Sequence, residues 1–162
     1  MKILEFKVFT FDELSDKAKE RAREWYRGAG LDYEWWDSTY DDAAQIGLRI
    51  TSFGLDRNRF ATGEFTKDAQ TVCDLILANH GVSCETHKTA LKFKNDFNDL
   101  KSPSEDYDDK FGELKEEFEK SLLEDYSIIL QKEYEYLYSN ESVDENIKAN
   151  EYTFLESGKR FG

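Results

Sequence analysis

The 162-residue sequence has no apolar run long enough to cross a bilayer, and it has only two cysteines, Cys73 and Cys84. Its opening residues, MKILEFKVFTF, are interrupted by Lys2, Glu5 and Lys7, where a signal peptide would carry an unbroken apolar segment. Two cysteines are too few for a disulfide framework, and a reducing compartment would keep both as thiols. These absences predict a cytoplasmic protein that does not insert into a membrane.

Basic side chains are scarce, with 22 Lys and Arg against 35 Asp and Glu, so the net charge is −13. Residues 96–151 hold 18 acidic and 6 basic side chains, and nearly all the excess negative charge therefore lies in the last third. Binding to nucleic acid depends mainly on Lys and Arg that neutralise phosphates. The composition argues against direct nucleic-acid binding and favours a protein partner that is basic or that itself binds nucleic acid.

The pattern of apolar side chains predicts an α+β fold in a single domain that spans residues 1–162. The chain is long enough for one core, and 39% of its residues are hydrophobic. Alternating apolar positions predict an N-terminal strand at residues 3–9, a hairpin at 48–65 and a C-terminal strand within EYTFLESG. In the first strand of the hairpin, Leu48 and Ile50 alternate on one face while Phe53 and Leu55 fall on the other. A bulge near Ser52 would bring all four to the same face. These strands are expected to form a small antiparallel sheet in which the last strand pairs with the first.

Helical periods predict several helices packed with this sheet. They are expected at about residues 15–30, 32–47, 66–81, 83–103 and 105–138, with a short helix near residue 142. The candidate N-terminal caps are Ser15, Thr66, Ser83 and a capping box from Ser142 to Glu145. Pro103, the only proline, is expected to end the fourth helix.

The stretch DYEWWDSTYDD, residues 32–42, permits two interpretations. On a helix from about Asp32 to Gly47, spacings of four, three and four place on one stripe Trp36, Tyr40, Ala43 and Gly47. Its carboxylates are Asp32, Glu34, Asp37, Asp41 and Asp42. Loops that bind magnesium or calcium usually carry a fixed glycine among alternating carboxylates, and this stretch lacks that pattern. A core seam with a solvated acidic face is favoured over a metal or recognition site.

All of the chain's cysteines and histidines fall within 15 positions: Cys73, His80, Cys84 and His87. Thiolate and imidazole are the usual ligands of zinc, but this spacing matches no recognised zinc finger. Cys73 lies on the apolar stripe of one predicted helix, and Cys84 and His87 open the next one. A junction of two helices with buried thiols is favoured over a zinc site, and no metal or other cofactor is predicted.

The long helix predicted at about 105–138 is the most acidic element. It carries 12 acidic and 4 basic residues, a net charge of −8 over about 50 Å. One charge per roughly 6 Å is several times sparser than the phosphates of duplex DNA, at about one per 1.7 Å. This helix alone is therefore not expected to mimic DNA.

The same helix supplies the candidate partner-binding residues. Tyr136 lies about 200° around the helix from Tyr134 and so leaves the predicted core stripe. An exposed aromatic residue among carboxylates is a candidate contact for a protein partner. The predicted contact residues are Glu116, Glu117, Glu124, Glu135 and Tyr136. The alternative is a solvated acidic face that serves only solubility.

The chain shows no catalytic motif with a defined spacing, so a non-enzymatic protein is expected. Four segments together resemble a family of small acidic proteins encoded by bacteriophages and prophages, usually labelled hypothetical or antitoxin-like. The segments are FTFDELSDKAKERAREWYR, YEWWDSTYDDAAQIGLRITSFGLDR, ILANHGVSCETHKTA and LEDYSIILQKEYEYLYSNESV. The resemblance covers nearly the whole chain, transfers no catalytic or binding residue, and implies a phage origin and action in the bacterial cytoplasm.

Three functions from different classes follow from these observations. The favoured one is a phage accessory protein that binds and inhibits a host defence protein, for instance as an anti-CRISPR, through its acidic surface. The first alternative is an antitoxin-like protein that neutralises a basic toxin. The second is a metal-dependent enzyme that uses the carboxylates or the Cys/His group. The sequence leaves the oligomeric state open.

Overall fold

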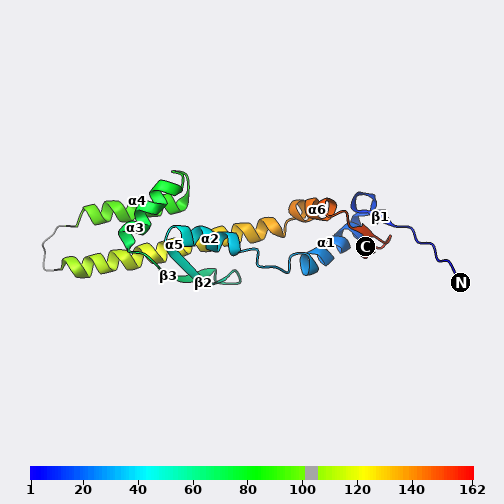
Figure 1. Cartoon of the computed structure of the whole chain (residues 1–162), viewed down its shortest axis with the longest axis horizontal. Helices are drawn as coiled ribbons and strands as arrows, with labels where there is room; N and C mark the ends of the chain where they lie inside the picture. Colours follow the sequence, from blue (N-terminus) through cyan, green and yellow to red (C-terminus); the bar gives the residue numbers. More distant parts are fainter. Residues whose placement is uncertain (101–105) are drawn as a thin grey trace. The chain divides into compact units, whose positions relative to one another are not determined.

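A computed structural model describes residues 1–100 and 106–162 (Figure 1). The predicted α+β class is confirmed: six α-helices accompany two small antiparallel sheets in the described residues. The chain divides into two compact units, unit 1 with residues 1–35 and 132–162, and unit 2 with residues 36–131. Each unit has its own cluster of buried apolar side chains. The single domain stays a prediction, since two compact units can belong to one domain.

Unit 1 combines segments from the two ends of the sequence. Its elements are strand β1 (Phe9–Thr10), a 3₁₀ turn (Phe11–Glu13), α1 (Asp16–Ala29), α6 (Asn140–Ala149) and strand β4 (Thr153–Phe154). The predicted pairing of the last strand with the first is confirmed, because β1 and β4 are antiparallel and Phe9 lies opposite Phe154. Phe154 is fully buried in the core of this unit.

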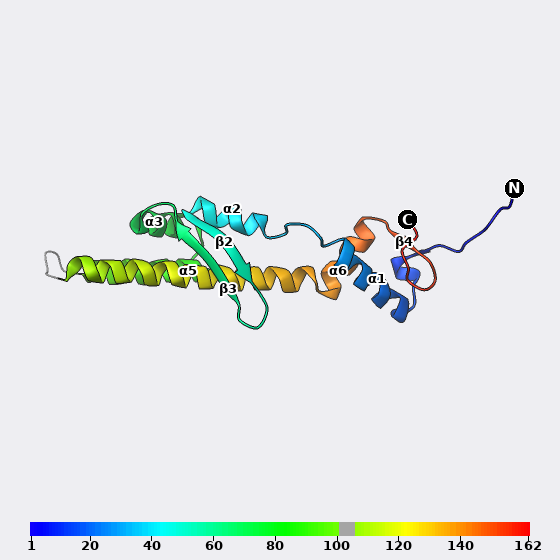
Figure 2. The same cartoon turned by 90° about the horizontal axis from the view of Figure 1, so that it is seen from below.

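Unit 2 is built around a hairpin and helices from the middle of the sequence. Its elements are α2 (Asp37–Gln45), β2 (Leu48–Gly54), β3 (Phe60–Phe65), α3 (Ala69–Asn79), α4 (Glu85–Asn98) and most of α5 (Tyr107–Leu137). The hairpin is the predicted one, and its register shifts between Ile50 and Ser52, which confirms the bulge. The hairpin lies beside α5 in both views (Figure 2). The strands thus form two separate antiparallel sheets, β1 with β4 and β2 with β3, instead of the one small sheet that was predicted.

The predicted strand at residues 3–9 is wrong over most of its length. Residues 1–8 have no regular secondary structure, and only Phe9 and Thr10 are in a strand. The reason is that the partner strand, β4, offers only two residues for pairing. The apolar side chains at positions 3, 4, 6 and 8 are consequently exposed.

The helix caps were predicted with mixed success. Ser15 caps α1 as predicted, with its hydroxyl accepting a hydrogen bond from the Ala18 amide at 3.2 Å. Thr66 is not the cap of α3, because its amide bonds to Gly47 and continues the hairpin, and Asp68 takes the role. Cys84 replaces Ser83 at the start of α4, and Ser139 replaces Ser142 at the start of α6.

The predicted seam on the second helix is partly correct. Ala43 and Gly47 are buried, but Trp36 and Tyr40 are only half-buried, and both rings contact Phe53 of the hairpin. The helix starts at Asp37, so Asp32 and Glu34 precede it instead of occupying its first turn. They lie where the chain passes from unit 1 to unit 2.

The long acidic helix is present as α5, which begins at Tyr107. Its predicted start at Glu105 lies outside the described residues, as does Pro103. The fourth helix, however, was predicted to run to Pro103 and ends earlier, at Asn98, where the Asp99 amide bonds back to Asn95 and Phe97. The buried side chains of α5 recur every four residues at Phe118, Leu122, Tyr126 and Leu130. The residues up to 131 belong to unit 2 and those from 132 to unit 1. None of the helices in the described part of the chain is long and apolar enough to span a membrane.

Candidate binding groove

Three of the predicted contact residues, Glu116, Glu117 and Glu124, line one open groove in unit 2. The groove lies between the start of β3, α4 and α5. Its other lining residues are Arg59, Phe60, Ala61, Thr89, Glu119, Lys120, Ser121, Leu123 and Asp125. Five carboxylates and two cations therefore line it, so the groove has an excess of negative charge.

The groove is positioned by the aromatic core of unit 2. On α5, Phe118 stacks on Phe93 of α4 with ring centroids 4.4 Å apart, and it also contacts Phe65 at the end of β3. The apolar face of α5 thus packs against both neighbours. The carboxylates that flank Phe118, Glu117 and Glu119, lie outside this apolar face and line the groove.

Arg59 joins the hairpin to α5 at one wall of the groove. Its guanidinium donates to Glu124 Oε1 at 2.6 Å, to Gln131 Oε1 at 2.7 Å and to Ser127 Oγ at 3.1 Å. A planar guanidinium can serve three acceptors at once, which an ammonium on a flexible stem does less well. Glu124 therefore has a structural partner as well as a place in the groove.

Asp125 is the most enclosed carboxylate of the groove. Thr89 of α4 donates a hydrogen bond to its Oδ2 at 2.6 Å. Burial raises the pKa of the Asp125 carboxyl, and the Thr89 bond partly opposes that shift. Among the described residues no Lys or Arg pairs with Asp125. The groove therefore holds one half-buried negative charge with no cation beside it.

The remaining charges differ in how strongly they are neutralised. Glu117 Oε1 lies 3.3 Å from Lys92 Nζ in an exposed ion pair, and exposed ion pairs contribute little to stability. Within the described chain Glu116 has no ion pair. Phe60, which also lines the groove, is 47% exposed. The same groove thus offers an incoming molecule both negative charge without a strong ion-pair partner and an exposed aromatic ring.

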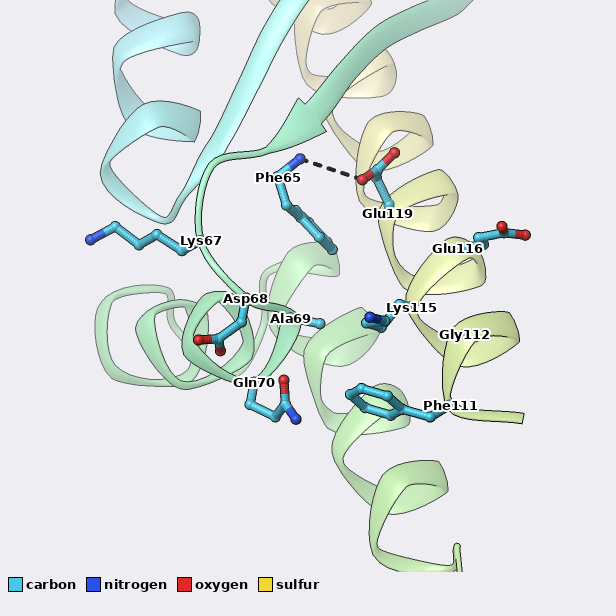
Figure 3. A pocket seen from close by; sticks show the side chains of 10 residues that line it. All are labelled: Phe65, Lys67, Asp68, Ala69, Gln70, Phe111, Gly112, Lys115, Glu116 and Glu119. Atoms are coloured by element: carbon cyan, nitrogen blue, oxygen red, sulfur yellow. Dashed lines mark hydrogen bonds between the residues drawn. The ribbon is translucent and has the colours of Figure 1, made fainter. Parts of the chain in front are cut away.

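A second hollow of unit 2, of about 900 Å³, shares Glu116 and Glu119 with this groove (Figure 3). Its polar groups are used locally: Glu119 accepts from the Phe65 amide, and Asp68 caps α3 through the Thr71 amide. The Phe65 and Phe111 rings border the hollow, while the Glu116 carboxylate points away from it. Its lining charges are of mixed sign, with two lysines and three carboxylates.

The other two predicted contact residues, Glu135 and Tyr136, are not part of the groove. Both are exposed and belong to unit 1. Tyr136 leaves the apolar stripe as predicted and is 52% exposed. Tyr134, predicted to lie in the core stripe, is also exposed, with its ring stacked on Tyr138 at 4.4 Å. The stripe fails at Tyr134 because unit 2 ends at residue 131 and its core no longer covers the helix there.

The cysteines and histidines lie at a helix junction, but the expectation of buried thiols is correct only for Cys73, because Cys84 is exposed at the start of α4. Cys73 is buried and donates to the Ala90 carbonyl at 3.3 Å, and burial raises the pKa of its thiol to about 11. His80 Nδ1 lies 2.6 Å from Thr86 Oγ1, and His87 Nδ1 lies 2.9 Å from the His80 carbonyl. In the described part of the chain, no three Cys, His, Asp or Glu side chains are grouped to hold a metal ion.

The carboxylates of the second helix are likewise not grouped around a cation site. Asp37, Asp41 and Asp42 are exposed on α2. Asp42 accepts a hydrogen bond from the buried Tyr126 hydroxyl at 2.9 Å. Tyr126 belongs to the four-residue repeat of buried side chains on α5, but no sequence signal links it to a residue that lies 84 positions earlier.

Comparison with protein-family models, with curated proteins and with solved structures finds no match to this chain. The geometry of the groove is therefore the structural basis for the docking site proposed below.

Proposed function

We propose that the chain is an accessory protein of a phage or prophage that binds and inhibits a basic host defence protein, in the manner of an anti-CRISPR. The acidic groove of unit 2 is the docking site. The observation that carries the proposal is the combination, in one groove, of exposed carboxylates at Glu116 and Glu117 with the exposed ring of Phe60. The phage origin rests on the sequence resemblance.

The charge of the groove selects the class of partner. A surface of one sign steers partners of the opposite sign and makes association sensitive to salt. Nucleic acid would be repelled by the carboxylates. A protein that binds nucleic acid presents the Lys and Arg that the groove would attract, so a nucleic-acid-binding host protein is a suitable partner.

The apolar part of the groove supplies contact energy that charge does not. Exposed ion pairs contribute little on their own, whereas buried aromatic side chains dominate the binding energy of protein interfaces. Phe60 can be covered by the partner because it lines the groove and is exposed. Binding should therefore depend on Phe60 for affinity and on Glu116 and Glu117 for steering.

The test is affinity purification of the tagged full-length chain from bacterial cells during phage infection. Three chains are compared: the wild type, the groove variant Glu116→Lys/Glu117→Lys, and a matched control, Glu145→Lys/Glu156→Lys. The control makes the same change in net charge at exposed carboxylates of unit 1. We expect the wild type and the control to retain a basic partner that the groove variant loses, with all three equally folded by circular dichroism.

The identity of the recovered protein separates the candidate functions. Recovery of a nuclease or a surveillance complex supports the inhibitor function. Recovery of a small basic toxin would instead indicate that the chain is an antitoxin that uses the same groove. If the groove variant retains the partner with unchanged affinity and salt dependence, the groove is not the docking site. Tyr136→Ala then tests the exposed surface of unit 1 that includes Glu135.

A further inference from the structure

The segment that precedes β1 exposes more apolar surface than any other in unit 1. Ile3, Leu4 and Phe6 are 79%, 76% and 62% exposed, and Val8 is exposed as well. Single exposed apolar residues are ordinary, but a contiguous run of them marks an interaction surface. Figure 1 shows this segment as an extended trace leading into β1.

The backbone of this segment has an open position for a partner strand. β1 pairs with β4 on one edge, and β4 is bridged on its other side by Arg160 opposite Phe154. No strand of the described chain lies on the second edge of β1. An unpaired edge presents free N–H and C=O groups and is a template for strand addition. Ile, Phe and Val are residues that favour strands, so the segment is suited to extend β1.

We propose that residues 3–9 pair antiparallel with the same residues of a second copy of this chain, about a two-fold axis at Phe6. In this register Phe6 lies opposite Phe6 of the second copy, Leu4 lies opposite Val8, and Glu5 lies opposite Lys7. Side chains alternate between the two faces of a strand. One face of the ribbon is then entirely apolar, and the other carries two Glu–Lys pairs between Ile3 and Phe9.

Charge complementarity selects this register over its neighbours. If the two-fold axis lies at residue 5 instead of residue 6, Glu5 faces Glu5 of the second copy. If the axis lies at residue 7, Lys7 faces Lys7. Like charges directly opposite one another destabilise a strand pair. Registers in between place charged side chains opposite apolar ones and mix the two faces. The segment is thus complementary to itself in one arrangement, as a two-fold interface requires.

Phe161 supports the same arrangement from within unit 1. Its ring centroid lies 6.3 Å from that of Phe6, and both rings are more than half exposed. Phe161 is therefore placed on the face that carries Leu4, Phe6 and Val8. In the paired form that face would hold six aliphatic and aromatic side chains from the two segments, with a Phe161 beside each Phe6.

The first test is the association state of full-length charge variants, measured by sedimentation or light scattering over a range of concentrations. Glu5→Lys places Lys opposite Lys7, and Lys7→Glu places Glu opposite Glu5. Each single variant should dimerise about tenfold more weakly than the wild type. An equimolar mixture of the two variants, and the double variant Glu5→Lys/Lys7→Glu, should both recover association, because every charge again faces its opposite.

The second test locates the axis by disulfide trapping in a Cys84→Ser background. Phe6→Cys should form a disulfide between copies, because directly opposite residues have Cα separations within the range that a disulfide spans. Leu4→Cys, which faces Val8, should not. A monomeric wild type at every concentration, no recovery in the mixture, or equal cross-linking at positions 4 and 6 would each overturn the proposal.

Discussion

The Tyr126 hydroxyl donates a hydrogen bond to Asp42 Oδ2 over 2.9 Å, which ties a fully buried side chain of α5 to an exposed side chain of α2. His80 Nε2 lies 3.6 Å from the same oxygen. Burial, and to a smaller extent the charge of Asp42, raises the pKa of the Tyr126 hydroxyl well above its usual range. The phenol therefore remains a donor at neutral pH, and Asp42 connects α2, α5 and the end of α3.

This relationship predicts unequal costs for its two partners. Asp42→Ala leaves a buried hydroxyl without its acceptor and should lower the free energy of unfolding by about 1–3 kcal/mol, whereas Tyr126→Phe should cost only about 1 kcal/mol. The double variant should cost less than the sum. Chemical denaturation measures these values, and Asp41→Ala, at the exposed neighbour, is the control. Equal and negligible effects at Asp42 and Asp41 would show that the hydrogen bond does not stabilise the fold.

Asp125 predicts a dependence of stability on pH. Burial raises the pKa of the Asp125 carboxyl in the folded state above its value in the unfolded chain, so the protonated form favours folding. The stability that the protonated carboxyl contributes is therefore lost as the pH rises through the folded-state pKa. Asp125→Asn should therefore unfold at a higher temperature than the wild type near neutral pH. The difference should disappear as pH falls through the ordinary range of an aspartate. Glu116→Gln removes an equal charge at an exposed position and should not reproduce this pH dependence in thermal melts.

The two cysteines should react at very different rates. Cys73 is buried and burial holds the pKa of its thiol at about 11, whereas Cys84 is exposed. Because the thiolate is the reactive form, a thiol reagent near pH 8 should modify Cys84 rapidly and Cys73 only after denaturation. Mass spectrometry of the Cys84→Ser and Cys73→Ser variants separates the two sites. Rapid native labelling of the Cys84→Ser variant would contradict the buried position of Cys73.

Arg59 should stabilise the hairpin through geometry as well as charge. Arg59→Lys keeps the positive charge, but a lysine cannot donate to Glu124, Gln131 and Ser127 together. The free energy of unfolding should therefore fall by about 1–2 kcal/mol. Hydrogen exchange should report faster exchange in β2 and β3. Arg57→Lys, in the same turn, is the matched control and should have little effect. Unchanged protection in the Arg59 variant would mean that these hydrogen bonds are not formed in solution.

The dual role of Glu124 changes how the groove should be tested. Glu124→Lys would remove a carboxylate from the groove and also repel Arg59, which lies 2.6 Å away. A loss of binding in that variant would not distinguish the two effects. Glu116 and Glu117 avoid this ambiguity because neither contacts the hairpin guanidinium, and they are the better positions for charge reversal.

Periodic patterns predicted the elements well because apolar spacing is a local property. The hairpin with its bulge, the cap at Ser15 and the long helix all follow from residues close together in the sequence. The strand at residues 3–9 failed because alternation cannot show how many residues a distant partner strand offers. Tyr134 failed for a related reason, since periodicity continues along α5 beyond the last residue of unit 2.

The groove itself was only partly predictable. Charge counting identified Glu116, Glu117 and Glu124 as candidates, and the structure places all three in one groove. The sequence could not separate them from Glu135 and Tyr136, because the division into units is set by long-range contacts. Three other lining residues, Phe60, Thr89 and Asp125, were not identified from the sequence. Each lies in the groove only because elements distant in the sequence come together there.

The pairing of Phe9 with Phe154 has a consequence for how the chain folds during synthesis. Unit 2 is a continuous segment, so its core can form once residue 131 has left the ribosome. Unit 1 must wait for α6 and β4, because these elements, which pack against α1 and β1, are synthesised after all of unit 2. Closing such a long loop is slow relative to forming local contacts. The first 35 residues therefore stay unfolded longest, and they are where a chaperone or a protease would meet the nascent protein.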